Sequence, residues 1–544
     1  RIPDVFDCWF ESGSMPYASQ NYPFSKSESF EKERFPADFI AEGLDQTRGW
    51  FYTLMVLSTA LFNKPAFNNV IANGLVLAED GQKMSKSKKN FPDPNLILDK
   101  YGSDALRLYL ISTPVVRADS MKFSEKGIQD IIRSIHIFLD NGLEYFKQTI
   151  DFYEKNYKTK FKPLTIEELA DKVTLFDNMM LNYLQHFINF IHNEMNGYRL
   201  YNIVNKIKEF IRKFSKWYMN FNKSRFRSTN NENDCLTSLS VLYLCFKTYS
   251  IVTAPFAPFY SEFIYQKLFE FSDNICLNYK SVHFEKIPEH VWECDTVMIE
   301  CIDIIEKIIE LNRKIKAEND INSHKRPVKL VTVYLKNESL ITILDRIREQ
   351  LELECNILSI KWSVQYDSMV ESSVKLNFKN CGKRLKSSIK SIKDILSKYN
   401  SIDIACLVNN LKLNDFHHID GVQFSESDFI FEEKLMNNKK NIGFIAPIVM
   451  ESDLSNDEEI DNIFNCKKLV RFIQDLRRDN NYIPTDDLIV NYYSEDKNML
   501  DFILKNKEFF INTLHVQEIN EKQVENFFEY NFGESSINFS LQKV

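Results

Sequence analysis

Two lysines three residues apart, Lys83 and Lys86, form the most chemically suggestive feature of the sequence. They lie in a glycine-containing turn that follows an apolar, strand-like run over residues 70–77. Ammonium groups act as point charges on phosphate oxygens, and nearby hydroxyls and backbone amides add donors, so this turn suits a polyphosphate. Most lysine-rich turns are solvated basic loops, and spacing alone leaves that alternative open. The residues predicted to contact the phosphates are Lys83, Met84, Ser85, Lys86 and Ser87.

A polar cluster after an earlier strand-like segment is a second candidate site. The segment begins as an apolar strand, turns at Gly43 and continues into a helix, which in an α/β fold places ligand groups at the carboxyl end of a strand. Glu42 and Asp45 supply carboxylates suited to an α-ammonium group or to ribose hydroxyls, and Gln46 offers a donor and an acceptor. The simpler alternative makes Asp45 the helix N-cap and Arg48 its partner within the helix.

The order of these two segments resembles class I aminoacyl-tRNA synthetases, and in detail the isoleucyl-tRNA synthetases. The turn reads K-M-S-K-S, like the second signature motif of class I, and the earlier segment reads E-G-x-D-Q-x-R-G-W-F, unlike the valyl and leucyl relatives. The resemblance implies that Lys83 and Lys86 are catalytic, because in this family the loop closes on ATP and stabilises the departing pyrophosphate. It also implies that Gly74 and Val76 lie by the adenine of ATP. The residues that it implies for contact with the aminoacyl-adenylate are Glu42, Gly43, Asp45 and Gln46.

Two tryptophans complete the expected active site. Trp9 lies in a segment, residues 6–18, that looks like the place where the family's chain re-enters the catalytic domain after its editing insertion. The resemblance implies that Trp9 and Trp50 wall the pocket for the isoleucine side chain, and rigid aromatic walls suit a branched aliphatic group. On composition alone, ordinary core packing is the stronger explanation for either residue.

Length and composition indicate several folded domains. Of the 544 residues, 44% are hydrophobic and 13% aromatic, enough to bury large cores. No apolar run reaches the ~18 residues that span a bilayer. The formal charge of −8 does not decide on nucleic-acid binding, which depends on the local field of a basic face. Ten cysteines occur without a C-x-x-C pair, which argues against zinc and disulfides and fits a reducing cytosol.

Changes in periodicity divide the chain into four predicted parts. Residues 1–125 alternate strands with helices, and residues 126–320 have long helical periodicity. Residues 321–450 and 451–544 each read as an α+β unit. The predicted fold class is therefore multidomain: the C-terminal half of an α/β Rossmann-like class I synthetase catalytic domain, an all-α anticodon-binding helical bundle, and α+β C-terminal units. The C-terminal parts resemble the eukaryotic and archaeal branch of the family.

A basic face is predicted on the helical segment from Leu200 to Tyr218. Its apolar residues recur on one arc, and five cations fall off that arc. Such a face suits the phosphates of tRNA. Further cations lie in the segments that resemble the family's C-terminal region. The predicted tRNA-binding residues are Lys206, Lys208, Arg212, Lys213, Lys216, Lys383, Arg384, Arg477 and Arg478.

The resemblance implies ATP-dependent activation of isoleucine to isoleucyl-adenylate, with Mg²⁺ accompanying the nucleotide, and transfer of the acyl group to tRNA(Ile). Two alternatives stay open: a module that only binds tRNA, and a synthetase of the valyl or methionyl type. The family's His-x-Gly-His signature and editing domain are absent from the sequence, which begins at Arg1, so we expect a piece of a longer protein that is inactive alone. We expect a cytoplasmic protein without bound zinc or membrane contact, either a monomer or a member of a multi-synthetase assembly.

Overall fold

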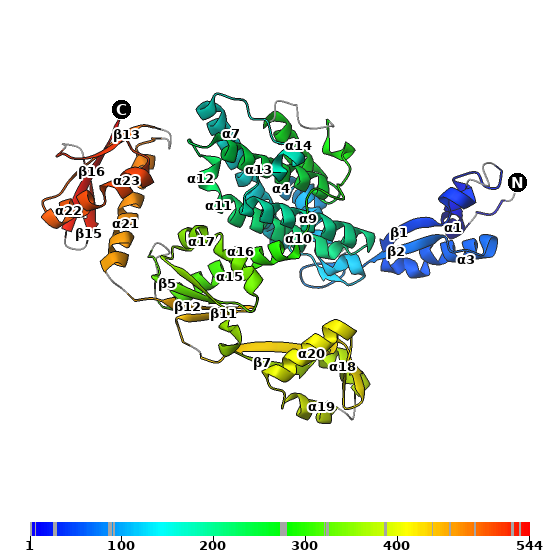
Figure 1. The fold of residues 1–544 in the computed structure, drawn as a ribbon. Helices are drawn as coiled ribbons and strands as arrows, with labels where there is room; N and C mark the ends of the chain where they lie inside the picture. The colour runs from blue at the N-terminus through cyan, green and yellow to red at the C-terminus, as the bar shows by residue number, and fades with distance from the viewer. Residues whose placement is uncertain are drawn as a thin grey trace. The chain divides into compact units, whose positions relative to one another are not determined.

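The chain forms two compact units, Arg1–Ile302 and Asp303–Val544, and each is described by itself. Figure 1 shows the elements of both in a computed structural model. The residues that the structure describes are 3–5, 7–24, 30–84, 90, 93–271, 280–319, 321, 326–385, 389–437, 439–455, 458–482, 486–523, 527–532 and 535–544.

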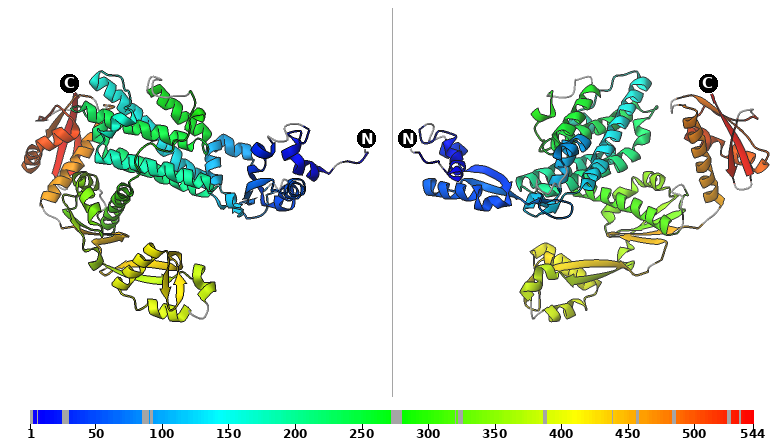
Figure 2. Two further views of the ribbon diagram at one scale, coloured as in Figure 1. Left: turned by 45° about the vertical axis from the view of Figure 1, so that its right-hand side comes forward. Right: turned by 180° about the vertical axis from the view of Figure 1, so that it is seen from behind.

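The first unit begins with an α/β part. Strands β1 (Ala37–Gly43) and β2 (Phe67–Asn73) pair in parallel, with Gly43 opposite Asn73. A parallel pair needs a crossover connection, and helix α3 (Trp50–Phe62) supplies it. Helix α1 (Cys8–Ala18) packs against α3 (Figure 2). The carboxyl ends of both strands therefore meet at one edge. The buried core of this α/β part consists of Tyr17, Phe30, Phe35, Leu54 and Ala66.

Two side chains of helix α5 (Ser103–Ile111) connect this α/β part to the helices that follow. Asp104 accepts a hydrogen bond from the backbone N–H of Tyr260 at 2.6 Å. Arg107 donates to the carbonyl oxygens of Pro255 and Phe256 at 3.1 and 3.2 Å. These contacts tie the two parts of the unit together. The elements from the start of the unit to this point also include η1 (Phe30–Arg34), η2 (Leu44–Arg48), β3 (Val76–Leu77), α4 (Pro94–Tyr101), α5 (Ser103–Ile111), η3 (Pro114–Arg117) and β4 (Met121–Lys122).

The rest of the first unit is helical. The predicted apolar arc is buried from Ile203 to Tyr218, and it lies on α10 and the π-helical turn η6. The helices are α6 (Glu125–Ile131), η4 (Ile132–His136), α7 (Ile137–Tyr157), α8 (Ile166–Ala170), α9 (Leu175–Asn196), η5 (Leu200–Asn202), α10 (Ile203–Arg212), η6 (Lys213–Tyr218), α11 (Met219–Phe221), α12 (Lys223–Phe226), α13 (Glu232–Thr253), α14 (Pro258–Phe271) and η7 (Val282–Phe284).

A buried ionic network fixes the centre of the helical part. Both guanidinium Nη atoms of Arg225 donate to the carboxylate of Asp177 at 2.8 and 2.9 Å, and Arg225 also pairs with Asp234. The Tyr218 hydroxyl donates to the same Asp177 carboxylate. Burial alone would raise the pKa of Asp177, but these hydrogen bonds and the charge of Arg225 hold it below its ordinary value.

Helix α13 is long and apolar enough to cross a membrane by length and composition. Within the bundle, however, 83% of its most apolar stretch is buried. It therefore fits the role of a core helix of the bundle.

The second unit contains a four-stranded sheet of order β11-β12-β5-β6. Strands β5 and β6 are parallel, whereas β12 runs antiparallel to both β5 and β11. Helix α15 packs closely on β11, because a Cβ at Gly443 would lie 2.8 Å from Leu311. The Tyr334 hydroxyl donates to Glu451 of β12 at 3.1 Å. The elements are α15 (Thr296–Glu318), β5 (Leu330–Tyr334), α16 (Glu338–Asp345), α17 (Arg348–Cys355), β6 (Ile360–Ser363), β11 (Ile442–Ile445) and β12 (Ile448–Asp453).

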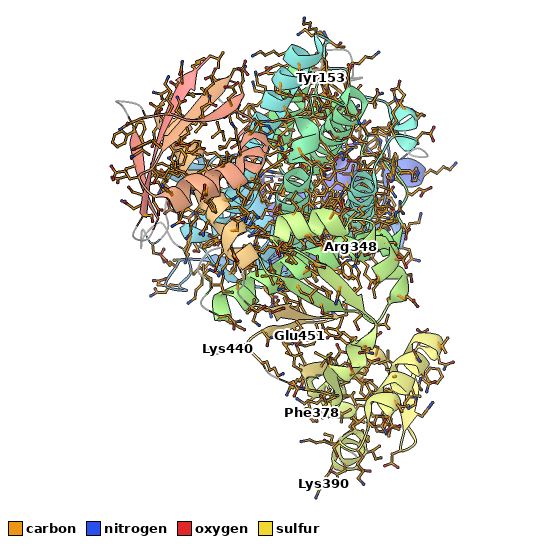
Figure 3. All side chains as sticks on the ribbon, turned by 60° about the vertical axis from the view of Figure 1, so that its left-hand side comes forward. Tyr153, Arg348, Phe378, Lys390, Lys440 and Glu451 are labelled. Atoms are coloured by element: carbon orange, nitrogen blue, oxygen red, sulfur yellow. The ribbon has the colours of Figure 1, made fainter. Side chains whose placement is uncertain are left out.

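A module is inserted between β6 and β11. Its first strand pairs antiparallel with its last, Val370 opposite Leu435, so the module begins and ends at neighbouring points. Phe378 and Lys390 lie on its helices (Figure 3). Its elements, with the turn before it, are η8 (Gln365–Ser368), β7 (Val370–Leu376), α18 (Phe378–Leu385), α19 (Ile389–Leu396), α20 (Ser401–Asn414), β8 (His417–Ile419), β9 (Val422–Phe424), η10 (Glu426–Asp428) and β10 (Phe429–Leu435).

The last part of the second unit is a sheet of order β14-β13-β16-β15 with three helices. Its core joins Leu469 and Ile473 of the long helix α21 to Leu488 and Ile537 of the sheet. The division of the chain into four parts, with the boundaries given above, stays a prediction. The elements are α21 (Glu458–Asp479), β13 (Leu488–Tyr493), α22 (Lys497–Lys505), α23 (Lys507–Leu514), β14 (Glu518–Glu521), β15 (Phe528–Phe532) and β16 (Ser535–Lys543).

Candidate functional site

The carboxyl edge of β1 and β2 gathers the residues predicted for adenylate and adenine. Gly43 ends β1, and Gly74 directly follows β2. The N–H of Gly74 donates to the carbonyl oxygen of Val115 at 2.7 Å. A Cβ at position 74 would lie 2.0 Å from the backbone oxygen of Asp119, so only glycine fits there. Val76 follows, half-buried on β3. Glycine at position 74 therefore lets the backbone at Asp119 pack directly against the end of β2.

The polar cluster after β1 keeps its carboxylates in solvent. Glu42 and Asp45 are exposed. Gln46 accepts the backbone N–H of Trp50 at 2.9 Å through Oε1 and donates to Asp45 at 3.4 Å through Nε2. Gln46 thus satisfies an N–H of the first turn of α3, and the alternative in which Asp45 caps that helix is wrong. The arrangement leaves two carboxylates able to accept hydrogen bonds from an ammonium group or hydroxyls.

The two tryptophans lie on the helices α1 and α3, which pack against each other. A Cβ at Gly49 would lie 3.1 Å from the ring of Trp9, so this indole covers the residue before Trp50. Trp50 donates through Nε1 to the carbonyl oxygen of Ser12 in α1 at 3.0 Å. Trp9 remains 44% exposed. An exposed indole can cover an apolar side chain.

The lysine turn is anchored at both ends. Lys83 forms an antiparallel bridge with Leu77, and the turn before it contains Gly81 at φ 84°. The Asn90 amide donates to the carbonyl oxygen of Lys83 at 3.2 Å. Lys83 is exposed and Met84 half-buried. The other predicted phosphate ligands, Ser85, Lys86 and Ser87, lie outside the described residues.

The predicted basic face needs a correction at Lys206 and Lys213. Both are buried, at 8% and 1% exposure, rather than facing solvent. Their ammonium groups lie 5.0 and 4.9 Å from the ring centre of Tyr183 on α9. They also lie 3.1 and 3.6 Å from the Glu209 carboxylate. Burial alone would raise the pKa of Glu209, but these two cations hold it below its ordinary value. Both lysines serve packing and charge balance inside the bundle.

The other predicted tRNA contacts differ in their exposure. Arg212 and Lys216 are exposed and Lys208 is half-buried, where burial lowers its pKa. Arg477 donates to the carbonyl oxygens of Leu514 and Asp486 at 3.1 and 2.7 Å, which is a structural role. The remaining three are Arg384, which pairs with Asp428 at 2.6 Å, Arg478, which pairs with Asp475 at 3.2 Å, and Lys383, whose side chain lies outside the described residues.

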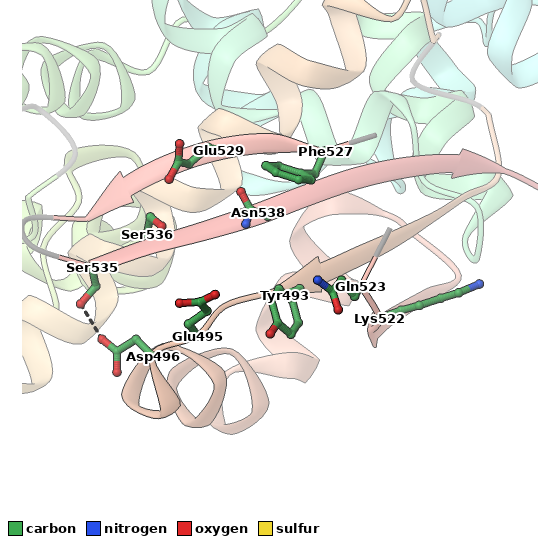
Figure 4. Close-up of a pocket in the computed structure, with 10 residues that line it drawn as sticks. All are labelled: Tyr493, Glu495, Asp496, Lys522, Gln523, Phe527, Glu529, Ser535, Ser536 and Asn538. Atoms are coloured by element: carbon green, nitrogen blue, oxygen red, sulfur yellow. Dashed lines mark hydrogen bonds between the residues drawn. The ribbon is translucent and has the colours of Figure 1, made fainter. Parts of the chain in front are cut away.

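A pocket of about 670 Å³ lies in the last sheet (Figure 4). Three carboxylates line it, those of Glu495, Asp496 and Glu529, and Asp496 accepts a hydrogen bond from the Ser535 hydroxyl. One cation, Lys522, also lines it. An acidic lining repels phosphate, so this pocket does not fit a nucleotide's phosphate chain. Among the described residues, no group of three or more His, Cys, Asp and Glu side chains could hold a metal ion.

Sequence reasoning missed the residues that surround Lys216. Tyr145 of α7 and Lys223 of α12 line a notch together with it. A signal was present, because Phe138, Gly142 and Tyr145 follow the i, i+4, i+7 spacing of one helix face.

The chain matches two family models. Residues 1–122 match class I tRNA synthetases (I, L, M and V), and residues 177–332 match the anticodon-binding domain of tRNA ligases. The first match covers the strand edge and the lysine turn, and the second covers most of the helical part. These two stretches of the chain are therefore similar to class I tRNA synthetases. The α/β part fits a fragment of the catalytic domain of that class, and the helical part fits its anticodon-binding domain.

Within that class, its homologues are cytoplasmic isoleucine–tRNA ligases. A probable cytoplasmic isoleucine–tRNA ligase of Dictyostelium discoideum is 37% identical over 94% of this chain and 48% of its own length. The cytoplasmic isoleucine–tRNA ligase of Saccharomyces cerevisiae is 36% identical over the same shares. The chain thus spans about half the length of the curated relatives it matches. An Agrobacterium radiobacter K84 LeuRS–tRNA–LeuAMS ternary complex aligns over 55% of this chain and 34% of that one, with 16% identity and a TM-score of 0.40.

Proposed function

We propose that this chain supplies the second half of the active site and the tRNA-binding region of an isoleucine–tRNA ligase. The observation that carries the proposal is the shared strand edge, where Gly43 ends β1 opposite Asn73, the last residue of β2. The polar cluster extends from the first strand and the lysine turn from the strand that follows the second. The isoleucine-specific identity of the relatives supports isoleucine over valine or methionine as substrate.

In the proposed reaction, the isoleucine carboxylate attacks the α-phosphate of ATP and pyrophosphate leaves. Glu42 and Asp45 hold the ammonium group of the amino acid or the ribose hydroxyls, which fixes the distance between the reacting atoms. The proposal assigns the adenosine to the strand edge beside Gly74 and Val76. Lys83, with Lys86, neutralises charge that develops on the departing phosphates. The described residues offer no cage for a metal, so Mg²⁺ would enter with the phosphates of the nucleotide.

In the second step the terminal ribose hydroxyl of tRNA(Ile) attacks the acyl carbon of the adenylate, which forms the ester, breaks the acyl–phosphate bond and releases AMP. The proposal assigns tRNA binding to the helical part and retains Lys208, Arg212 and Lys216 as phosphate contacts, because they keep at least part of their surface in solvent. Phosphate contacts carry no sequence information. Choice among tRNAs must therefore rest on groups that contact unpaired bases. We place the protein in the cytoplasm, as its relatives are named.

The test is ATP–pyrophosphate exchange by the protein that contains this chain, measured separately with isoleucine, valine and methionine. We expect exchange with isoleucine to be the fastest. Faster exchange with valine or methionine would reassign the substrate. Absence of exchange with all three, while tRNA still binds, would leave the chain as a tRNA-binding module.

A further inference from the structure

Strand β4 carries a lysine, Lys122, beside the turn that leads to Lys83. Lys122 is the partner of Leu77 in the parallel pair of β3 and β4, and Leu77 also forms the antiparallel bridge with Lys83 on its other edge. Residues paired across neighbouring strands point to the same face of a sheet. Lys83 and Lys122 therefore flank Leu77 on one face, two strand spacings or about 10 Å apart along the sheet.

The side chain of Lys122 lies against Gly81 in that turn. A Cβ at position 81 would lie 2.9 Å from the Cε atom of Lys122 and 3.3 Å from its Nζ atom, so any larger residue would displace the ammonium group. Gly81 also has a φ of 84°, which glycine adopts without strain. The glycine thus permits both the turn and the path of the lysine side chain, and a second ammonium group reaches the lysine turn from β4.

The backbone around Lys122 is held in place on both sides. The N–H of Phe123 donates to the carbonyl oxygen of Leu77 at 2.9 Å. The hydroxyl of Tyr109, a buried residue of α5, accepts the N–H of Ser124 at 2.9 Å and donates to the carbonyl oxygen of Lys122 at 3.5 Å. Strand β4 therefore fixes the start of this side chain relative to β3, the strand that leads into the turn.

The ammonium group of Lys122 is open to a ligand. The side chain is exposed, and within the part of the chain that the structure describes it forms no ion pair or hydrogen bond. Lys100 of α4, by contrast, pairs with Glu125 at 2.6 Å. A carboxylate of the turn itself, that of Asp80, accepts the N–H of Gln82 at 2.8 Å. Lys122 thus keeps three N–H donors for an anion.

We propose that Lys122 is a further catalytic residue, which contacts the pyrophosphate part of ATP from the side of β4. As the carboxylate oxygen of isoleucine bonds to the α-phosphorus, the bond from that phosphorus to the bridging oxygen breaks, and its electron pair leaves with pyrophosphate. Lys83 and Lys122 meet the resulting negative charge from two sides. The inference rests on the proposed function for the identity of the anion.

The experiment is ATP–pyrophosphate exchange by the protein that contains this chain, with ATP, pyrophosphate and isoleucine varied separately. Lys122→Met keeps an unbranched side chain over Gly81 and removes the charge, whereas Lys122→Arg keeps the charge. Lys64→Met is the matched control, because Lys64 is an exposed lysine in the loop before β2, at the opposite end of that strand from Gly74. Thermal unfolding of each variant confirms that it is folded.

We expect Lys122→Met to slow exchange by about 10²-fold, the lower end of the loss for one group that stabilises developing charge. The Michaelis constant for pyrophosphate should rise, and that for isoleucine should stay unchanged. Lys122→Arg should retain most of the rate, because a guanidinium group also binds phosphate. Lys64→Met should match the wild type.

A wild-type rate for Lys122→Met would overturn the inference. Equal losses in Lys122→Met and Lys122→Arg would also overturn it, because the lysine would then act through its shape over Gly81 rather than through its charge. So would a Michaelis constant for isoleucine that rises as much as that for pyrophosphate, since Lys122 would then support the whole site. Absence of exchange by the wild type would overturn the proposed function and the inference together, whereas the outcomes above concern Lys122 alone.

Discussion

The α/β part and the helical part of the first unit use their charged residues in opposite ways. At the strand edge, Glu42, Asp45 and Lys83 are exposed. In the helical part, Asp177 and Lys213 are buried at 0% and 1% exposure, each beside a group of opposite charge. Charges that await a ligand stay in solvent, whereas charges inside the bundle must be paired because desolvation would otherwise destabilise the fold.

The contrast predicts two separable outcomes of mutation. Changing an exposed charge at the strand edge should remove activity and leave stability intact. Changing a buried charge in the bundle should leave activity intact and lower the free energy of unfolding. A cation count along the sequence does not distinguish these cases.

Arg225→Leu should give the largest effect, a fall of about 3–5 kcal/mol in the free energy of unfolding, because it leaves the buried Asp177 carboxylate uncompensated. Urea unfolding at pH 7 measures this loss. The pKa of Asp177 is lowered in the fold, so its stabilisation is present above the unfolded pKa and is lost as the pH falls through the folded pKa. The acid-induced loss of stability should therefore be smaller in the variant. Unchanged stability of Arg225→Leu would mean that Asp177 has other sufficient partners.

Lys83→Ala should slow adenylate formation by roughly 10²–10³-fold, the scale of losing one group that stabilises developing charge. The same variant should unfold at the wild-type urea concentration, because Lys83 is exposed. ATP–pyrophosphate exchange by the protein that contains this chain measures the rate, and Lys64→Ala is the control, because Lys64 is an exposed lysine in the loop before β2. A wild-type exchange rate would remove Lys83 from the proposed site.

Lys316→Met should stabilise the second unit, because Lys316 is a buried cation that, among the described residues, forms no ion pair with a carboxylate such as Lys213 forms with Glu209. Its ammonium group faces the carbonyl oxygen of Cys355 at 3.4 Å and the cation Lys467, and burial lowers its pKa to about 8. The difference from 10.5 corresponds to about 3 kcal/mol of destabilisation at pH 7. Asn312 also donates to that carbonyl oxygen, so the variant leaves it paired.

The stability difference between the wild type and Lys316→Met should depend on pH. Below pH 8 the folded chain must keep Lys316 charged at full cost, and the cost falls as the pH rises from about 8 toward the ordinary value of 10.5. Wild-type stability should therefore gain relative to Lys316→Met across that interval. Parallel stability curves for the two proteins would show that Lys316 is solvated in the fold.

Gln46→Ala should give the smallest effect, a loss of about 1 kcal/mol in the free energy of unfolding, because it removes the hydrogen bond to the Trp50 N–H at the start of α3. Gln46→Glu keeps an oxygen near the Trp50 N–H and should restore most of that loss. Thermal unfolding measures both. If the two variants were equally unstable, the amide group of Gln46 would matter for its bond to Asp45 rather than for capping.

Sequence reasoning located the strand edge because its motifs are contiguous. The spacing from Glu42 to Gln46, and the turn at Lys83, can be read without knowing what packs against them. It failed for Lys206 and Lys213, because they flank the apolar arc and only the position of Tyr183 on α9 decides that they are buried. The pairing of β12 with β5 could not be predicted from the sequence either, since it joins segments more than one hundred residues apart.

The adjacent ends of the module between β7 and β10 have a consequence for how this chain can change. Because Val370 and Leu435 are paired, the module leaves and rejoins the rest of the unit at a single point. Such an insertion costs its host little chain entropy, whatever its length. Chains of this kind can therefore enlarge, shrink or exchange the module as one block while the sheet of β11, β12, β5 and β6 keeps its order, which makes residues 370–435 the natural place for lineages to diverge.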